Sequence, residues 1–280
     1  MRTAFGLDLA GYSTGRSGFA RADRDPGKEI RVTIYRDNIF CRKLMGCQPL
    51  ADMVNQERAV VQACMAKGPL VVDVPIDLQG LPDVEPAHFA WELTRRPVDF
   101  AFSALAALAD RIGSPTARFR HCLAGIRDGP EQLGQALWET YPAASLRLLH
   151  LKSTGYKRKA AVFEDDEWHQ ADGEDQPLAD LLNGLGWLCE RGQRVTDDEL
   201  DAALCALTGV ADDQARLEAD ALDVAIRARI AHKTKPDQRS QIRATPPRGF
   251  VLLTQLPLER VFLSVRQLRA PEETLTEVMA

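Results

Sequence analysis

Hydrophobic and polar positions along the N-terminal part of the chain predict a sheet with one helix. Three β-like segments, Thr3–Asp8, Ser17–Asp23 and Ile30–Tyr35, are separated by glycine- and proline-containing turns, which predicts an antiparallel meander. Gln48–Lys67 has apolar residues at helical spacing. Leu70–Val74 is a nearly unbroken apolar run, typical of a strand that is buried on both faces of a parallel sheet.

The middle of the chain is less regular. Residues 79–97 are rich in proline and predict a loop, within an insertion that spans about residues 79–134. Val98–Ile112 is expected to be a helix. A strand at Gln135–Thr140 and a helix at Pro142–Leu151 follow, the helix with proline in its first turn. Glu164–Asp175 is strongly acidic and predicts a solvated loop.

The C-terminal third alternates between helical and strand-like composition. Helices are expected at Pro177–Glu190, Asp198–Leu207 and Gln214–Ala231, and strands at Gly249–Leu256 and Val261–Leu268. The order of elements predicts an α/β fold with a mixed sheet flanked by helices. We expect a single domain over residues 1–280 with a helical C-terminal extension.

Composition narrows the class of protein. The 280 residues include 35 Lys and Arg against 40 Asp and Glu, a formal net charge of −5, which argues against coating of nucleic acid by bulk charge. The six cysteines form no CxxC pair, which favours reduced thiols and a cytoplasmic protein. The longest mainly apolar segment, Phe100–Ala109, is too short to cross a bilayer, so no membrane partner is expected.

Carboxylates stand where an ordinary core would exclude them. Asp8, Asp73 and Glu139 each follow an apolar strand-like run, and Asp201 lies in an apolar helical stripe one turn after Asp198. A carboxylate at such a place is costly to bury unless it is paired, and several together raise one another's pKa. A divalent cation relieves both costs, because Mg²⁺ takes oxygen ligands from carboxylates and from substrate phosphates.

Each acid also has a purely structural interpretation. Asp8 and Asp73 are also typical of strand-end turns, and Glu139 of a strand edge with its side chain in water. Asp198 is also expected as a first-turn acid that the helix dipole favours. The interpretation as a site therefore depends on whether the fold brings these residues together.

Four sequence words carry a resemblance to a known family. They are GLDLAG (Gly6–Gly11), VVDVPIDLQGLP (Val71–Pro82), ETYPAASLRLL (Glu139–Leu149) followed by GYK (Gly155–Lys157), and DELDAALCALTG (Asp198–Gly209). In this order they resemble domain-of-unknown-function family 429, a family of predicted RNase H-like nucleases. The resemblance implies an RNase H-like fold with a mixed five-stranded sheet and a nuclease that uses Mg²⁺ or Mn²⁺.

The resemblance also implies roles for particular residues. It makes Asp8, Asp73 and Asp201 metal ligands, with Glu139 and Asp198 as further candidates. Arg95, in the word RRPVD, and Lys157 become candidate substrate-binding residues.

A second acidic helix leaves the helical ligand open. Asp223 lies in Gln214–Ala231, which repeats the pattern of the helix that carries Asp201. The word DELDAALCALTG favours Asp201, and Asp223 stays as the alternative.

Three functions remain open on the sequence alone. The first is metal-dependent hydrolysis of phosphodiester bonds in DNA or RNA. The second is an ATP-dependent phosphotransferase of the sugar-kinase/actin-like superfamily, with a phosphate loop from Asp8 to Gly15. The third is a non-catalytic binding protein that retains the fold, because fold does not determine function.

Overall fold

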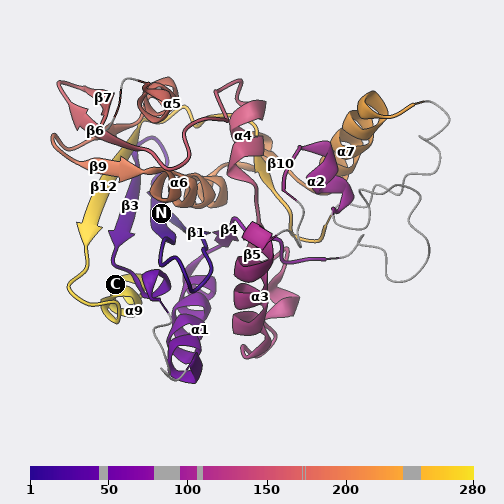
Figure 1. Ribbon diagram of the computed structural model, residues 1–280, viewed down its shortest axis with the longest axis horizontal. Helices are drawn as coiled ribbons and strands as arrows, with labels where there is room; N and C mark the ends of the chain where they lie inside the picture. The colour runs from indigo at the N-terminus through magenta and orange to yellow at the C-terminus, as the bar shows by residue number, and fades with distance from the viewer. Residues whose placement is uncertain (44–49, 79–94, 106–109, 172, 174, 236–246) are drawn as a thin grey trace.

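The computed structural model describes residues 1–43, 50–78, 95–105, 110–171, 173, 175–235 and 247–280. Its centre is a mixed seven-stranded sheet in the order β5-β4-β1-β2-β3-β12-β8 (Figure 1). In chain order these strands are β1 (Arg2–Asp8), β2 (Gly18–Arg24), β3 (Ile30–Arg36), β4 (Leu70–Val72), β5 (Leu137–Glu139), β8 (Leu188–Cys189) and β12 (Val261–Gln267). The N-terminal meander is confirmed: β2 is antiparallel to both β1 and β3.

The directions of the outer strands determine where the strand ends meet. β4 runs parallel to β1, and β5 runs parallel to β4, so the C-terminal ends of these three strands lie at one edge of the sheet. On the other side, β12 pairs in parallel with β3, and β8 with β12. A small sheet of β7 (Glu167–Gln170), β6 (Ala160–Glu164) and β9 (Arg194–Thr196) and the pair β10 (Arg216–Leu217) and β11 (Leu252–Leu253) complete the strands described.

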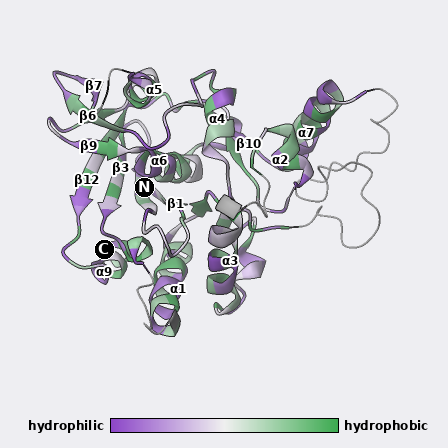
Figure 2. Ribbon diagram, viewed as in Figure 1, coloured by the Kyte–Doolittle hydropathy of each residue, from purple (hydrophilic) through white to green (hydrophobic). Residues whose placement is uncertain are grey.

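Helices cover both faces of the central sheet (Figure 1). The described helices are α1 (Leu50–Lys67), α2 (Pro97–Ala101), α3 (Asp110–Ala124), α4 (Pro142–Leu148), α5 (Pro177–Leu185), α6 (Asp197–Val210), α7 (Ala219–Lys233) and α9 (Glu273–Met279). α6 packs across β1, β2 and β4, and α1 packs against β1, β4 and α3. In Figure 2, α1 and α3 carry both hydrophobic and hydrophilic residues, as expected for helices with one face on the sheet and one in solvent.

The two-residue alternation of β1 decides which side chains meet α6. Phe5 and Leu7 point to the face that packs with α1 and α3, while Ala4 packs with α6. Gly6 shares the α6 face: a Cβ on Gly6 would lie 2.0 Å from the carbonyl oxygen of Ala202. A Cβ on Gly18, the cross-strand partner of Asp8, would lie equally close to the backbone of α6. Glycine on two adjacent strands therefore lets the helix backbone touch the sheet.

Several sequence predictions need correction. The central sheet has seven strands rather than five, because β12 and β8 extend it beyond β3. The acidic stretch Glu164–Asp175 is not only a loop, since β6 and β7 form a hairpin around Asp165 and Asp166. Both aspartates have positive φ, as a tight two-residue hairpin turn requires.

Two predicted helices are also shorter than expected. Val98–Ile112 is not one helix: α2 ends at Ala101, Ser103 has a positive φ, and α3 begins at Asp110. The helix predicted at Pro177–Glu190 stops at Leu185, where Gly186 adopts the left-handed conformation of a C-cap. Most of the loop predicted at residues 79–97 lies outside the described residues.

The structure also bears on the predicted absence of a membrane span and on the state of the cysteines. Within the described ranges, no helix combines the length and apolar character that a membrane span needs. The five described cysteines are free thiols, as predicted, and Cys47 lies outside the described residues.

The close contact between β1 and α6 yields a first prediction. We expect Gly6→Ala to lower the free energy of unfolding by about 1–3 kcal/mol or more, because the new methyl group meets helix backbone and cannot be accommodated by a rotamer change. Chemical denaturation measures the loss. The matched control is Gly184→Ala, at an exposed helical position whose new Cβ would meet only the side chain of Leu151; it should be neutral or stabilising. Equal stability of the two variants would contradict the tight β1–α6 contact.

Candidate metal centre

Two of the candidate acids lie at neighbouring strand ends. Asp8 is the last residue of β1, and Asp73 directly follows β4. Because β1 and β4 are parallel, both side chains reach the same edge of the sheet, and the Asp73 amide donates to the carbonyl of Leu7 at 2.9 Å. The parallel direction of β1 and β4 thus places Asp8 and Asp73 next to each other at one edge of the sheet.

The third acid comes from α6. Thr196 begins this helix with a capping box: its hydroxyl accepts from the Glu199 amide, and the Glu199 carboxylate accepts from the Thr196 amide. Asp201 follows in the second turn and is 1% exposed. The glycines opposite α6 let its backbone approach β1, and this approach brings Asp201 next to Asp8.

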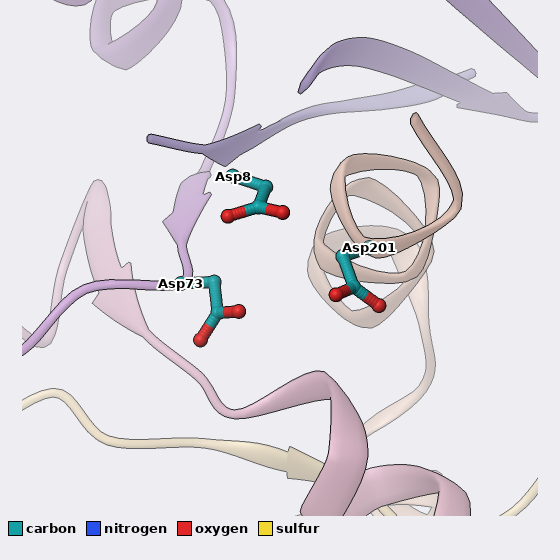
Figure 3. Close-up of side chains that lie close together, drawn as sticks. All are labelled: Asp8, Asp73 and Asp201. Atoms are coloured by element: carbon teal, nitrogen blue, oxygen red, sulfur yellow. The ribbon is translucent and has the colours of Figure 1, made fainter. Parts of the chain in front are cut away.

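Asp8, Asp73 and Asp201 form one cluster. One carboxylate oxygen from each lies within 4.8 Å of the other two (Figure 3). Oxygens on a single Mg²⁺ stand about 2.1 Å from the ion and so at most about 4.2 Å apart. The oxygens of the cluster, all within 4.8 Å of one another, lie close to that span, and an all-carboxylate set of hard donors suits Mg²⁺ or Mn²⁺. The residues present therefore fit a divalent cation.

A tyrosine and a lysine from the segment before β6 contact the cluster. The Tyr156 hydroxyl donates to Asp201 Oδ1 at 3.0 Å, and the Lys157 ammonium pairs with Asp201 Oδ2. The Lys157 side chain is 52% exposed whereas that of Asp201 is 1% exposed. Lys157 therefore links a buried carboxylate to solvent, where an incoming anion can meet it.

The electrostatics show a concentration of negative charge that is only partly compensated. Burial, opposed by Lys157 and reinforced by Asp73, raises the pKa of Asp8 well above its usual value. Burial, with the nearby Asp201 charge, raises the pKa of Asp73 to about 8. The pKa of Asp201 is raised by burial although Lys157 opposes the rise. Burial lowers the pKa of Lys157, but the carboxylates around it, Asp201 first, outweigh burial and raise it overall.

The cluster lies in a cleft of about 750 Å³. The loop after β1 contributes Ser13, Thr14 and Arg16, and the segment before β6 contributes Thr154 and Arg158. This volume falls within the roughly 300–1,000 Å³ of small-ligand sites. The cleft thus combines an acidic centre with hydroxyl and guanidinium groups.

Glu139 lies outside the three-carboxylate cluster. Glu139 is 2% exposed. The two terminal guanidinium nitrogens of Arg96 donate to its carboxylate at 2.6 and 2.9 Å, and the Ile76 amide donates to it at 2.8 Å. Arg96 also pairs with Asp99 at 2.8 Å. Through these partners the Glu139 carboxylate connects β5 to the start of α2. Its hydrogen bonds go to Arg96 and Ile76, and it is not one of the three clustered acids.

The remaining candidates divide between the cleft and other places. Asp198 lines the cleft, and burial together with Asp197 raises its pKa to about 6, but it is not one of the three clustered acids. Asp223 pairs with Arg227 on α7, so of the two alternatives it is Asp201 that joins Asp8. Arg95 is half-buried beside α2 and, unlike its neighbour Arg96, does not line the cleft.

One residue that contacts the cluster, Tyr156, and the ion pairs of Arg96 were not predicted from the sequence. Tyr156 is the central residue of the GYK word, and its hydroxyl is a direct donor to Asp201. Arg96 stands three residues before Asp99. This spacing places the two side chains on one helical turn and could have indicated the ion pair between Arg96 and Asp99.

Comparison with known proteins adds no relative: no protein-family model, curated protein or solved structure matches the chain. The function must therefore be argued from the site itself.

The raised pKa of Asp73 predicts how stability depends on pH without metal. Folding raises this pKa from 3.8 to about 8, so the folded protein keeps a proton that the unfolded chain releases between these values. The group's stabilising contribution is complete below about pH 4 and falls by up to about 1.4 kcal/mol per pH unit as the pH rises to 8. Denaturation in chelator should therefore show Asp73→Asn gaining stability relative to wild type over this range. Parallel pH profiles of the two proteins would contradict the buried cluster.

The Arg96 contacts predict a structural effect of Glu139→Gln. Removing one partner of a buried pair costs about 3–5 kcal/mol, so the variant should unfold at lower denaturant concentration. Mn²⁺ should still raise its melting temperature, since the three clustered carboxylates remain. Glu164→Gln, at an exposed position on β6, is the control and should leave stability unchanged. Loss of the Mn²⁺ effect with unchanged stability would instead make Glu139 a metal ligand.

Proposed function

We propose that the protein is a divalent-metal-dependent phosphodiesterase of RNase H-like fold that cleaves nucleic acid. The observation that carries the proposal is the convergence of Asp8, Asp73 and Asp201, from positions far apart in the chain, beside the cationic Lys157. Like charges of this kind are rarely gathered for stability alone, because each raises the pKa of the others.

The topology supports the fold part of the proposal. An antiparallel meander β1-β2-β3 is followed by β4, which pairs in parallel with β1, and by β5, which pairs in parallel with β4. Acids then stand on the first strand, after the fourth strand and on a late helix. This is the order of elements and acids on which the resemblance to RNase H-like nucleases rests.

The site residues divide into two chemical roles. Asp8, Asp73 and Asp201 would hold the ion, which when bound lowers the pKa of water and neutralises charge on a phosphate oxygen. Lys157, which lines the cleft, would donate to a non-bridging phosphate oxygen, and the Tyr156 hydroxyl, which donates to Asp201, would orient this carboxylate toward the ion. Hydrolysis adds water at phosphorus and releases one ester oxygen as an alcohol.

The test is hydrolysis by purified protein with Mn²⁺ or Mg²⁺. The substrates are bis(p-nitrophenyl) phosphate and labelled single-stranded and duplex DNA and RNA. Asp8→Asn and Asp201→Asn should each reduce kcat/KM at least about 100-fold, since groups that merely support metal ligands contribute about 10–100-fold. Asp180→Asn, an exposed aspartate on α5, is the matched control and should behave as wild type. Cleavage that survives in Asp8→Asn would refute the mechanism.

Thermal unfolding with added ligands, together with the hydrolysis assay, separates the alternatives. An ATP-dependent phosphotransferase would be stabilised against heat by ATP and Mg²⁺ but not by oligonucleotides. A non-catalytic protein would show neither metal-dependent stabilisation nor hydrolysis. The phosphotransferase is worth testing because Gly11, Ser13 and Thr14, part of its expected phosphate loop, line the cleft.

A further inference from the structure

Four cations gather around the short helix α2, next to the cleft. They are Arg95, Arg147, Arg229 and Lys233, here called the α2 basic cluster. α2 and α7, which carries Arg229 and Lys233, lie side by side at the right of Figure 1. Arg147 belongs to α4, and Arg95 directly precedes Arg96, the N-cap of α2. Three separate parts of the chain thus supply one concentration of positive charge.

Direct contacts hold three of these cations, Lys233, Arg147 and Arg229, in place. The Lys233 ammonium donates to the carbonyl oxygens of Phe100 and Ala101 at 2.6 and 3.1 Å. The Arg147 guanidinium donates to the carbonyl of Phe102, and the Arg229 guanidinium lies 4.6 Å from the centre of the Phe102 ring. Side chains held in this way lose less freedom when they bind an anion.

The α2 basic cluster lacks acidic partners within the described part of the chain. None of its four cations forms an ion pair there, whereas Arg24 and Arg36 pair with Glu259 and Glu199. The acids beside α2, Asp99 and Glu139, are both bound by Arg96. Burial lowers the pKa of Lys233, and Arg147, Arg95 and Arg229 lower it further. Folding therefore maintains a repulsion that a bound polyanion would relieve.

The α2 basic cluster adjoins the cleft that holds the candidate metal centre. Arg147 lines the same cleft as Asp8 and Asp201, as do Arg16 and Arg158. A small phosphodiester that occupied the acidic centre would leave the cations of α7 unused. A polymer that carries a phosphate on every residue would occupy both places at once.

We propose that the α2 basic cluster binds backbone phosphates of a nucleic acid beside the phosphodiester that lies at the metal centre. The protein is thereby matched to a polynucleotide and not to a mononucleotide or a small phosphodiester. This inference rests on the proposed function for the position of the scissile bond, but the binding itself is measurable without cleavage.

The experiment measures the affinity of the full-length protein for fluorescein-labelled oligonucleotides by anisotropy, with Ca²⁺ in place of Mg²⁺. The test variant is the double substitution Arg229→Gln and Lys233→Gln. Its affinity should fall about tenfold, and the slope of log affinity against log salt should become shallower by about 1.4–1.8, the value for two phosphate contacts. DNA and RNA, single-stranded and duplex, form the separate arms.

The control and a second variant keep the test decisive. Arg227→Gln removes a cation from the same helix that is already paired with Asp223, and it should bind with wild-type affinity and salt slope. Arg95→Gln removes a cation whose side chain makes no hydrogen bond to another described residue, so it tests the cluster without disturbing the Lys233 contacts. It should make the salt slope shallower by about 0.7–0.9.

The outcomes separate this inference from the proposed function. Unchanged affinity and salt slope in both test variants, or an equal loss in Arg227→Gln, would overturn the inference even if wild type cleaves DNA or RNA. Loss of affinity confined to the test variants supports it, even if wild type hydrolyses nothing with Mn²⁺. In the second case the nuclease proposal falls and a polynucleotide-binding surface remains.

Discussion

Burial of three closely spaced carboxylates at the edge of the sheet, and the repulsion among them, dominate the electrostatics of the candidate metal centre. Two parallel strand ends and a helix that packs against glycine bring Asp8, Asp73 and Asp201 together. Only one cation, Lys157, is in contact with an acid of this cluster in the described structure. Without a divalent ion, the remaining repulsion is relieved by bound protons, since the pKa of Asp73 is raised to about 8, or it lowers the free energy of unfolding.

Positive charge near the cleft is arranged in two different ways. Arg96 is buried and neutralised by Glu139 and Asp99, so it joins β5 to α2 and contributes little field to the cleft. Three cations of the α2 basic cluster, Arg147, Arg229 and Lys233, instead contact carbonyl oxygens and aromatic rings, which leave their charge uncompensated. In an acidic protein of net charge −5, this local surplus gives a polyanion a preferred approach toward an acidic centre.

The sequence predicted the centre of the fold better than its edges. The meander and the strands that became β4 and β5 have short apolar runs with clear turn residues, and their local patterns agree with their tertiary positions. The predicted number of strands was too low for two reasons. β8 is only two residues long, and β12 pairs with β3, from which it is separated by most of the chain. The acidic hairpin was missed because its composition indicates solvent exposure, which a turn satisfies as well as a loop.

For the site, the sequence by itself determined the kinds of side chain and their places at strand ends and on a helix. From these the candidates Asp8, Asp73 and Asp201 could be named. Only the tertiary structure decided that Glu139 pairs with Arg96 and that Asp201, rather than Asp223, meets Asp8. The physical reason is that strand position follows from local hydrophobic pattern, whereas the partner of a buried charge depends on which distant backbone can approach closely enough to exclude water.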